Sequence, residues 1–166
     1  MSLIIKDKIP MFKRGYPTVS DKYNVSGAVL SGAYPVRFGD IVKDATTLGY
    51  FAGVNANNTI ANVAEIRGFV VATNVKLNET YGGELVETKP GEAFNLLVDG
   101  FIAVELAEGA VDSEIKPNAA AYVTANGEVT TTGDNAKLGA NPIPNTVFTG
   151  MYEKHGDKIF AEIYIK

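Results

Sequence analysis

The stretch NLLVDGFIAVEL, residues 95–106, carries the strongest indication of fold in the sequence. Two apolar runs, rich in β-branched and aromatic residues, flank the dipeptide Asp99-Gly100. A dipeptide of this type between two such runs is typical of a β-hairpin, because Asp and Gly accept the positive backbone angles of a tight turn. We therefore expect residues 94–98 to pair with residues 101–106.

Two further hairpins are predicted on the C-terminal side of this stretch. In AAAYVTANGEVTTT, residues 119–132, the dipeptide Asn126-Gly127 suits a type I′ turn. The segment TVFTGMYE, residues 146–153, can pair with KIFAEIYIK, residues 158–166, across KHGD, where Gly156 readily supplies a positive φ.

The last of these segments alternates with the period of two that a half-buried strand requires. One face carries Ile159, Ala161, Ile163 and Ile165, and the other carries Phe160, Glu162, Tyr164 and Lys166. Because the second face is partly aromatic, we expect it to be partly covered as well.

The sequence upstream predicts short strands with frequent turns. YPVRFGDIVK (34–43), LGYFAGV (48–54) and IRGFVVATNV (66–75) each indicate one short strand, and YGGELVETKPGEAF (81–94) indicates a turn, a strand and a second turn at Pro90-Gly91. NNTIANVAEI (57–66) is the only helix candidate, with one or two turns at most, and GDNAKLGANPIPN (133–145) is predicted to be a long polar loop.

A glycine followed by an acid recurs directly before an apolar strand, in RFGDIV, KPGEAF and KHGDKIF. This is common turn chemistry, and its repetition suits a compact body with tight corners. Together these patterns predict an all-β fold, a small barrel or sandwich of about eight or more short, mostly antiparallel strands. We expect residues 1–24 to form an extended or flexible N-terminal arm and residues 25–166 to form a single β-rich domain, since a chain of 166 residues fits one domain.

Composition excludes several classes of function. The formal net charge of −4 argues against a nucleic-acid-binding protein, which normally has a basic face. No stretch approaches the roughly 20 apolar residues that span a bilayer, and charges and Pro10 interrupt the N-terminus too often for a signal peptide. Cysteine is absent, so disulfides and thiolate metal sites are excluded. We expect a soluble protein made in a cytoplasm.

Charge is unevenly distributed between the arm and the rest of the chain. Residues 1–22 have a net charge of +3, which leaves −7 for the remainder; the cations are Lys6, Lys8, Lys13, Arg14 and Lys22, against Asp7 and Asp21. One interpretation is a mobile, solvated tail. The other is an arm that becomes ordered on a partner, and its predicted partner-binding residues are Ile4, Ile5, Met11, Phe12, Arg14 and Tyr16.

No pattern of catalytic residues is visible. The only histidine, His155, falls in a predicted turn, and the serines form no Gly-x-Ser-x-Gly motif. The acids near the strands (Glu84, Glu87, Glu92, Asp99 and Glu105) have no spacing that fixes a pair. We therefore predict that the protein is not an enzyme and binds no cofactor or metal. A small enzyme whose site has only oxygen ligands is kept as the third hypothesis.

The eight Tyr and eight Phe, without any Trp, suit a core or a protein interface better than a sugar platform. A non-catalytic glycan-binding β module, in a phage tail or a surface adhesin, remains the alternative hypothesis. Exposed coplanar rings in a groove would favour it.

The order of segments resembles a known family. SGAVLSGAYPVRFGDIVK follows the arm, and then come FAGV, KPGEAFNLLVDGFIAVEL, NAAAYVTANGEVTTT and the closing IFAEIYIK. In this order, and in short motifs at residues 35–42, 91–106 and 122–129, the chain is similar to the head decoration proteins of tailed bacteriophages, also called structural cement proteins.

The resemblance implies a small β-barrel, often trimeric, that binds the outer face of an expanded capsid. Its partner would be the major capsid protein, and its location the exterior of the virion after synthesis in the cytoplasm of the bacterial host. Each copy would need only modest affinity, because a trimer that contacts several capsid subunits gains by multivalency.

Overall fold

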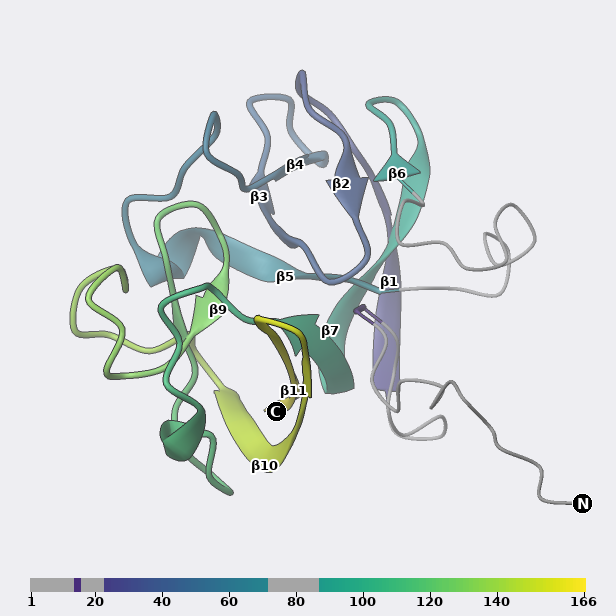
Figure 1. The fold of residues 1–166 in the computed structure, drawn as a ribbon. Coiled ribbons are helices and arrows are strands. Elements are labelled where there is room, and N and C mark those ends of the chain that lie inside the picture. The colour runs from purple at the N-terminus through teal and green to yellow at the C-terminus, as the bar shows by residue number, and fades with distance from the viewer. Residues whose placement is uncertain (1–13, 16–22, 72–86) are drawn as a thin grey trace, which may run out of the picture.

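The structure is a computed structural model that describes residues 14–15, 23–71 and 87–166 (Figure 1). These residues form mainly antiparallel β-structure with two single turns of 3-10 helix, η1 and η2. The elements are β1 (Tyr23–Val29), β2 (Val36–Arg37), β3 (Ile41–Asp44), β4 (Phe51–Gly53), η1 (Val63–Glu65), β5 (Ile66–Val71), β6 (Glu87–Thr88), β7 (Ala93–Glu105), η2 (Asp112–Glu114), β8 (Tyr122–Val123), β9 (Val129–Thr130), β10 (Thr146–His155) and β11 (Lys158–Ile165).

The main sheet has seven strands in the order β10-β11-β7-β5-β3-β4, with β1 as a further partner of β7. Strands β2 and β6 form one two-stranded sheet, and β8 and β9 form another. The prediction of an all-β fold is confirmed. The predicted barrel is wrong for the residues that the structure describes, because the terminal strands β4 and β10 do not pair with each other and no sheet closes. No helix in these ranges is long and apolar enough to cross a membrane.

The predicted hairpin at Asp99-Gly100 is also wrong. The chain continues through this dipeptide as one strand, β7, which pairs with β1 along residues 93–100 and with β11 along residues 100–105. The pairing with β1 passes from Asp99 to Leu97 and leaves Val98 without an opposite residue, so a β-bulge at Val98 directly precedes the dipeptide. Gly100 has a φ of 130°, which glycine accepts readily.

The bulge has a packing role that a turn could not perform. Leu97 and Ile102 both belong to the larger hydrophobic core, although a regular strand would place residues five positions apart on opposite faces. The one extra residue at the bulge reverses the alternation of side chains between the two faces. Both halves of β7 therefore direct apolar side chains into the same core. Non-local partners for each half therefore prevail over the local hairpin preference.

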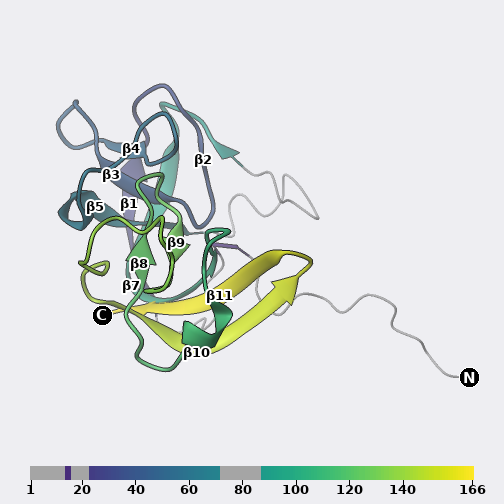
Figure 2. The same ribbon diagram turned by 60° about the vertical axis from the view of Figure 1, so that its left-hand side comes forward.

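The other two predicted hairpins are confirmed. Strands β8 and β9 flank the Asn126-Gly127 turn, where Gly127 has a φ of 84°. Strands β10 and β11 meet with His155 opposite Lys158, and Gly156 has a φ of 62°. Figure 2 shows this second hairpin as a long ribbon (yellow) whose turn lies far from the C-terminus.

Two upstream predictions need correction or refinement. Residues 34–43 form two strands, β2 and β3, because the chain turns at Gly39 with a φ of 87°. The predicted helix is the single 3-10 turn η1, which begins with a capping box between Asn62 and Glu65. Residues 72–75 and 81–86 of the predicted strands lie outside the described residues.

The recurring pair of a glycine and an acid forms the same reciprocal turn at two of its sites. The backbone N–H of Arg37 donates to Asp40 Oδ2 at 2.7 Å, while the N–H of Asp40 donates to the Arg37 carbonyl at 3.1 Å. Lys89 and Glu92 repeat both bonds, at 2.7 and 3.0 Å. The acid thus closes the turn that its glycine makes possible.

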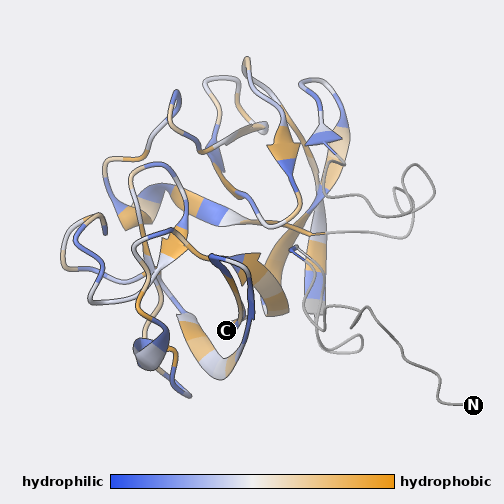
Figure 3. Cartoon of the chain, viewed as in Figure 1, coloured by the Kyte–Doolittle hydropathy of each residue, from blue (hydrophilic) through white to orange (hydrophobic). Residues whose placement is uncertain are grey.

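Both faces of the central strands are covered by apolar side chains. In β5, Phe69 and Val71 belong to the larger core, whereas Val70 belongs to a second core on the other face. In β7, Leu97 and Leu96 divide in the same way. Figure 3 shows the hydrophobic residues as orange segments on β2 and β7. Burial on both faces makes the centre of the sheet rigid.

Candidate attachment site at the root of the arm

The residues Arg14 and Gly15, here called the arm root, are bound to the β-body. The N–H of Gly15 donates to the carbonyl of Ala103 in β7 at 2.7 Å. Gly15 has a φ of 73°, and a Cβ atom at this position would clash with the Cβ of Phe38 and the nitrogen of Gly39. Only glycine allows the backbone to approach the turn before β3 so closely.

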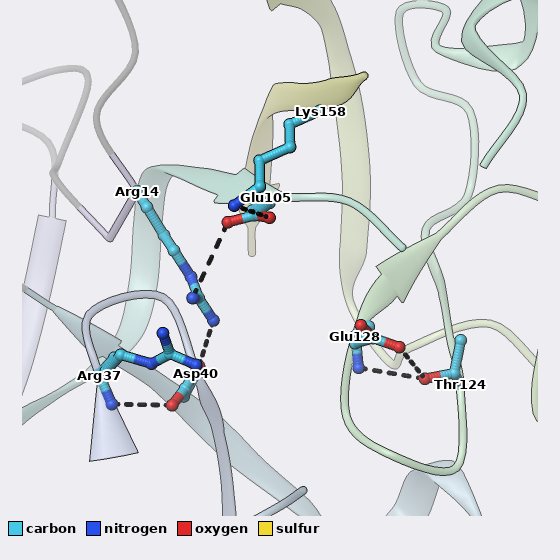
Figure 4. Close-up of polar contacts among 7 residues, drawn as sticks. All are labelled: Arg14, Arg37, Asp40, Glu105, Thr124, Glu128 and Lys158. Carbon is cyan, nitrogen blue, oxygen red and sulfur yellow. Dashed lines mark hydrogen bonds and ion pairs between the residues drawn. The ribbon is translucent and has the colours of Figure 1, made fainter. Parts of the chain in front are cut away.

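The Arg14 side chain connects carboxylates from two parts of the fold (Figure 4). Its guanidinium forms an ion pair with Asp40, which precedes β3, and lies 3.9 Å from Glu105 Oε2 at the end of β7. Lys158 Nζ in β11 lies 3.1 Å from the other oxygen of Glu105. Cations and carboxylates alternate along this cluster, so each carboxylate has a cationic partner.

Burial raises the pKa of Asp40 above its ordinary value of 3.8. The charge of Arg14 and the hydrogen bond from the Arg37 N–H favour the ionised form, but they do not fully offset the loss of hydration. Acid therefore protonates Asp40 at a higher pH than an ordinary Asp and weakens its ion pair with Arg14.

We expect the carboxyl carbon of Asp40 to titrate in NMR with a midpoint above 3.8, and Arg14→Gln to raise that midpoint further by removing the attraction of Arg14. Since the pKa is higher in the folded chain, the folded chain binds the proton more tightly. The contribution of Asp40 to the free energy of unfolding is thus fully present below the unfolded pKa and is lost as pH rises through the folded pKa. A midpoint at or below 3.8 would contradict this account.

The structure places one of the predicted partner-binding residues. Arg14 contacts the protein's own β-body, and its contact with a partner stays a prediction. Ile4, Ile5, Met11, Phe12 and Tyr16 lie outside the described residues. Sequence reasoning missed Gly15, Asp40 and Glu105. The Gly39-Asp40 turn motif was visible, but nothing local indicates that it receives the arm.

The described residues provide no visible catalytic centre. His155 lies at the end of β10, with Nε2 3.1 Å from Glu153 Oε2 and its ring edge-on to Phe160. Within the described ranges, no group of three or more His, Asp or Glu side chains could hold a metal ion. A pocket of about 190 Å³ beside Val98 and Lys166 is lined by no Asp, Glu or His side chain.

Comparison with known proteins agrees with the resemblance of the sequence. A solved structure, "The capsid of Myoviridae Phage XM1", contains a chain of similar fold, with a TM-score of 0.61 and 14% identity over 93% of this chain and 90% of that chain. No curated protein sequence gives a significant match. The model of a family described as structural cement protein (E217 gp24/Pam3 gp6) matches residues 13–164. Because that match spans nearly the whole sequence, the chain belongs to the phage structural cement protein family.

Proposed function

We propose that this protein stabilises a phage capsid by binding to its outer surface and holding neighbouring major capsid proteins together. The observation that carries the proposal is the family match over residues 13–164. The two-sided core supports it, because a rigid body transmits force between subunits without deforming. None of the described features favours the glycan-binding alternative.

The N-terminal arm is the proposed contact with the capsid. Its charge of +3 and its alternating cationic and apolar residues suit an extended segment that becomes ordered on a protein surface. The arm root supports this role: Arg14 and Gly15 fix where the arm leaves the body, so tension on the arm is passed to β7 and to the turn before β3. The proposed contact residues in the arm are Ile4, Ile5, Met11, Phe12 and Tyr16, together with Arg14.

We propose that three copies assemble and that each contacts a different capsid subunit. Linked contacts raise the avidity far above the affinity of one copy. The protein would be made in the host cytoplasm and would attach once the shell has expanded. Native mass measurement tests the trimer, and a monomer at micromolar concentration would contradict it.

The capsid role is tested with expanded phage heads that lack this protein. We expect the purified chain to co-sediment with these heads and to raise the temperature at which they rupture. Unexpanded heads are the control, and we expect them to bind little. Equal rupture temperatures with and without saturating protein would contradict the proposal.

A further inference from the structure

The sheet formed by β10, β11 and β7 has a second face, turned away from the larger core. Ala161 and Ile163 of β11 and Ile102 and Val104 of β7 point into that core. Their neighbours along each strand therefore lie on the opposite face. We call it the C-terminal sheet face; it is defined by Phe101, Ala103, Glu105, Phe160, Glu162 and Tyr164.

Glu162 lies in the middle of this face and is only 6% exposed. Its backbone carbonyl accepts a hydrogen bond from Thr149, but within the described part of the chain no hydrogen bond or ion pair reaches its carboxylate. By contrast, Glu105 on the same face has cationic partners. Burying a carboxylate without a donor is costly, so Glu162 indicates a contact that another segment completes.

The surroundings of Glu162 indicate the kind of group that completes this contact. Phe160 and Tyr164 flank it along β11, and Ala103 is opposite it in β7. The ring of Tyr164 stacks on Phe101, with centroids 4.4 Å apart and planes at 17°. A carboxylate among aromatic rings suits a lysine, whose methylene stem packs on the rings while its ammonium group pairs with the acid.

The arm has the required residues and starts next to this face. Gly15 is hydrogen-bonded to Ala103, which is the residue opposite Glu162 in the sheet. The segment before the arm root contains three lysines among apolar residues; they are Lys6, Lys8 and Lys13. With at most about 3.5 Å of chain per residue, each lysine is within reach of Glu162 from this starting point. The positive arm and the negative remainder of the chain are also complementary in charge.

We propose that, in the free protein, residues 1–13 bind the C-terminal sheet face of their own chain, with one of their lysines paired to Glu162. This inference rests on the proposed function in one respect: the same arm must leave this face in order to bind the capsid. The face therefore shields the apolar residues of the arm before attachment.

Limited digestion with trypsin tests the contact in the full chain. Cleavage after Lys8 and Lys13 is expected to be about fivefold faster in Glu162→Gln than in the wild type, because digestion follows the population of the released arm. Glu108→Gln is the matched control, since it removes the same charge from an exposed residue, and we expect it to digest at the wild-type rate. Equal rates for Glu162→Gln and the wild type overturn the proposal.

Carbodiimide cross-linking of an equal mixture of ¹⁴N- and ¹⁵N-labelled chains identifies the occupant. We expect an amide between Glu162 and Lys6, Lys8 or Lys13, with both peptides carrying the same isotope. If the contact joined two chains, random pairing in the equal mixture would make about half of the cross-links mixed in isotope; that result assigns the face to the arm of a second copy and overturns the proposal.

Binding to expanded heads separates this inference from the proposed function. Glu162→Gln is expected to co-sediment with heads at least as well as the wild type, because its arm is already released. If that variant binds heads but digests no faster than the wild type, the inference fails and the capsid role stands. If neither the wild type nor Glu162→Gln binds heads, the proposed function fails. The digestion rates still show whether the arm contacts Glu162.

Discussion

Deletion of residues 1–13 is expected to abolish attachment to expanded phage heads while leaving the β-body folded. The deletion keeps Arg14 and Gly15, so the hydrogen bond to Ala103 and the ion pair with Asp40 remain. What is lost is the segment with alternating cationic and apolar residues, which contains four of the six proposed contact residues, Ile4, Ile5, Met11 and Phe12. Co-sedimentation measures attachment, and circular dichroism shows that the fold persists.

Two variants with multiple substitutions separate the contributions of the cationic and the apolar arm residues to attachment. Replacing Lys6, Lys8 and Lys13 with Gln is expected to weaken attachment mainly at low salt, where charges are least screened. Replacing Ile4, Ile5, Met11 and Phe12 with Ser is expected to weaken it at every salt concentration, because apolar burial does not depend on screening. A chain without residues 1–13 that binds heads as tightly as the full chain would show that these residues do not make the capsid contact.

The sequence predicted those parts of the fold that depend on neighbouring residues. The turns at Gly127 and Gly156 were located correctly because each strand pairs with the strand that follows it. The dipeptide Asp99-Gly100 has an equally strong local preference, but β1 and β11 occupy the two halves of β7. The residues around a dipeptide do not indicate which distant strands will pair with it. Turn chemistry alone therefore could not distinguish a hairpin from a bulge.

The arm root shows the same limit for the candidate site. Arg14 was predicted as a partner-binding residue because of the charge of the arm. Its carboxylate partners, Asp40 and Glu105, are distant in sequence and come together only when β3 and β7 enter the same sheet. The alternation of β11 correctly placed Glu162 on the second face. Its nearly complete burial depends on the packing of other segments, which periodicity does not describe.

The close approach of β5 to β7 predicts that a single added methyl group has a large effect on stability. A Cβ atom at Gly68 would lie 2.6 Å from the carbonyl oxygen of Leu97, and Gly68 has a φ of 155°. Backbone atoms cannot move aside as a flexible side chain can, so Gly68→Ala forces the two strands apart. We expect the free energy of unfolding to fall by about 3 kcal/mol. For a chain of this size, thermal unfolding followed by circular dichroism should show a midpoint about 6–12 °C lower.

Gly27→Ala is the matched control for this prediction. Gly27 also lies within a strand, β1, but a Cβ atom there would have no neighbour within 4 Å, and its backbone lies outside the range that disfavours other residues. Alanine restricts the unfolded chain more than glycine does, so this variant should be unchanged or more stable by up to about 1 kcal/mol. The two glycines thus differ in what surrounds them and not in the type of element. Equal losses of stability in the two variants would show that the spacing between β5 and β7 does not determine the cost, and would contradict the tight packing at the centre of the sheet.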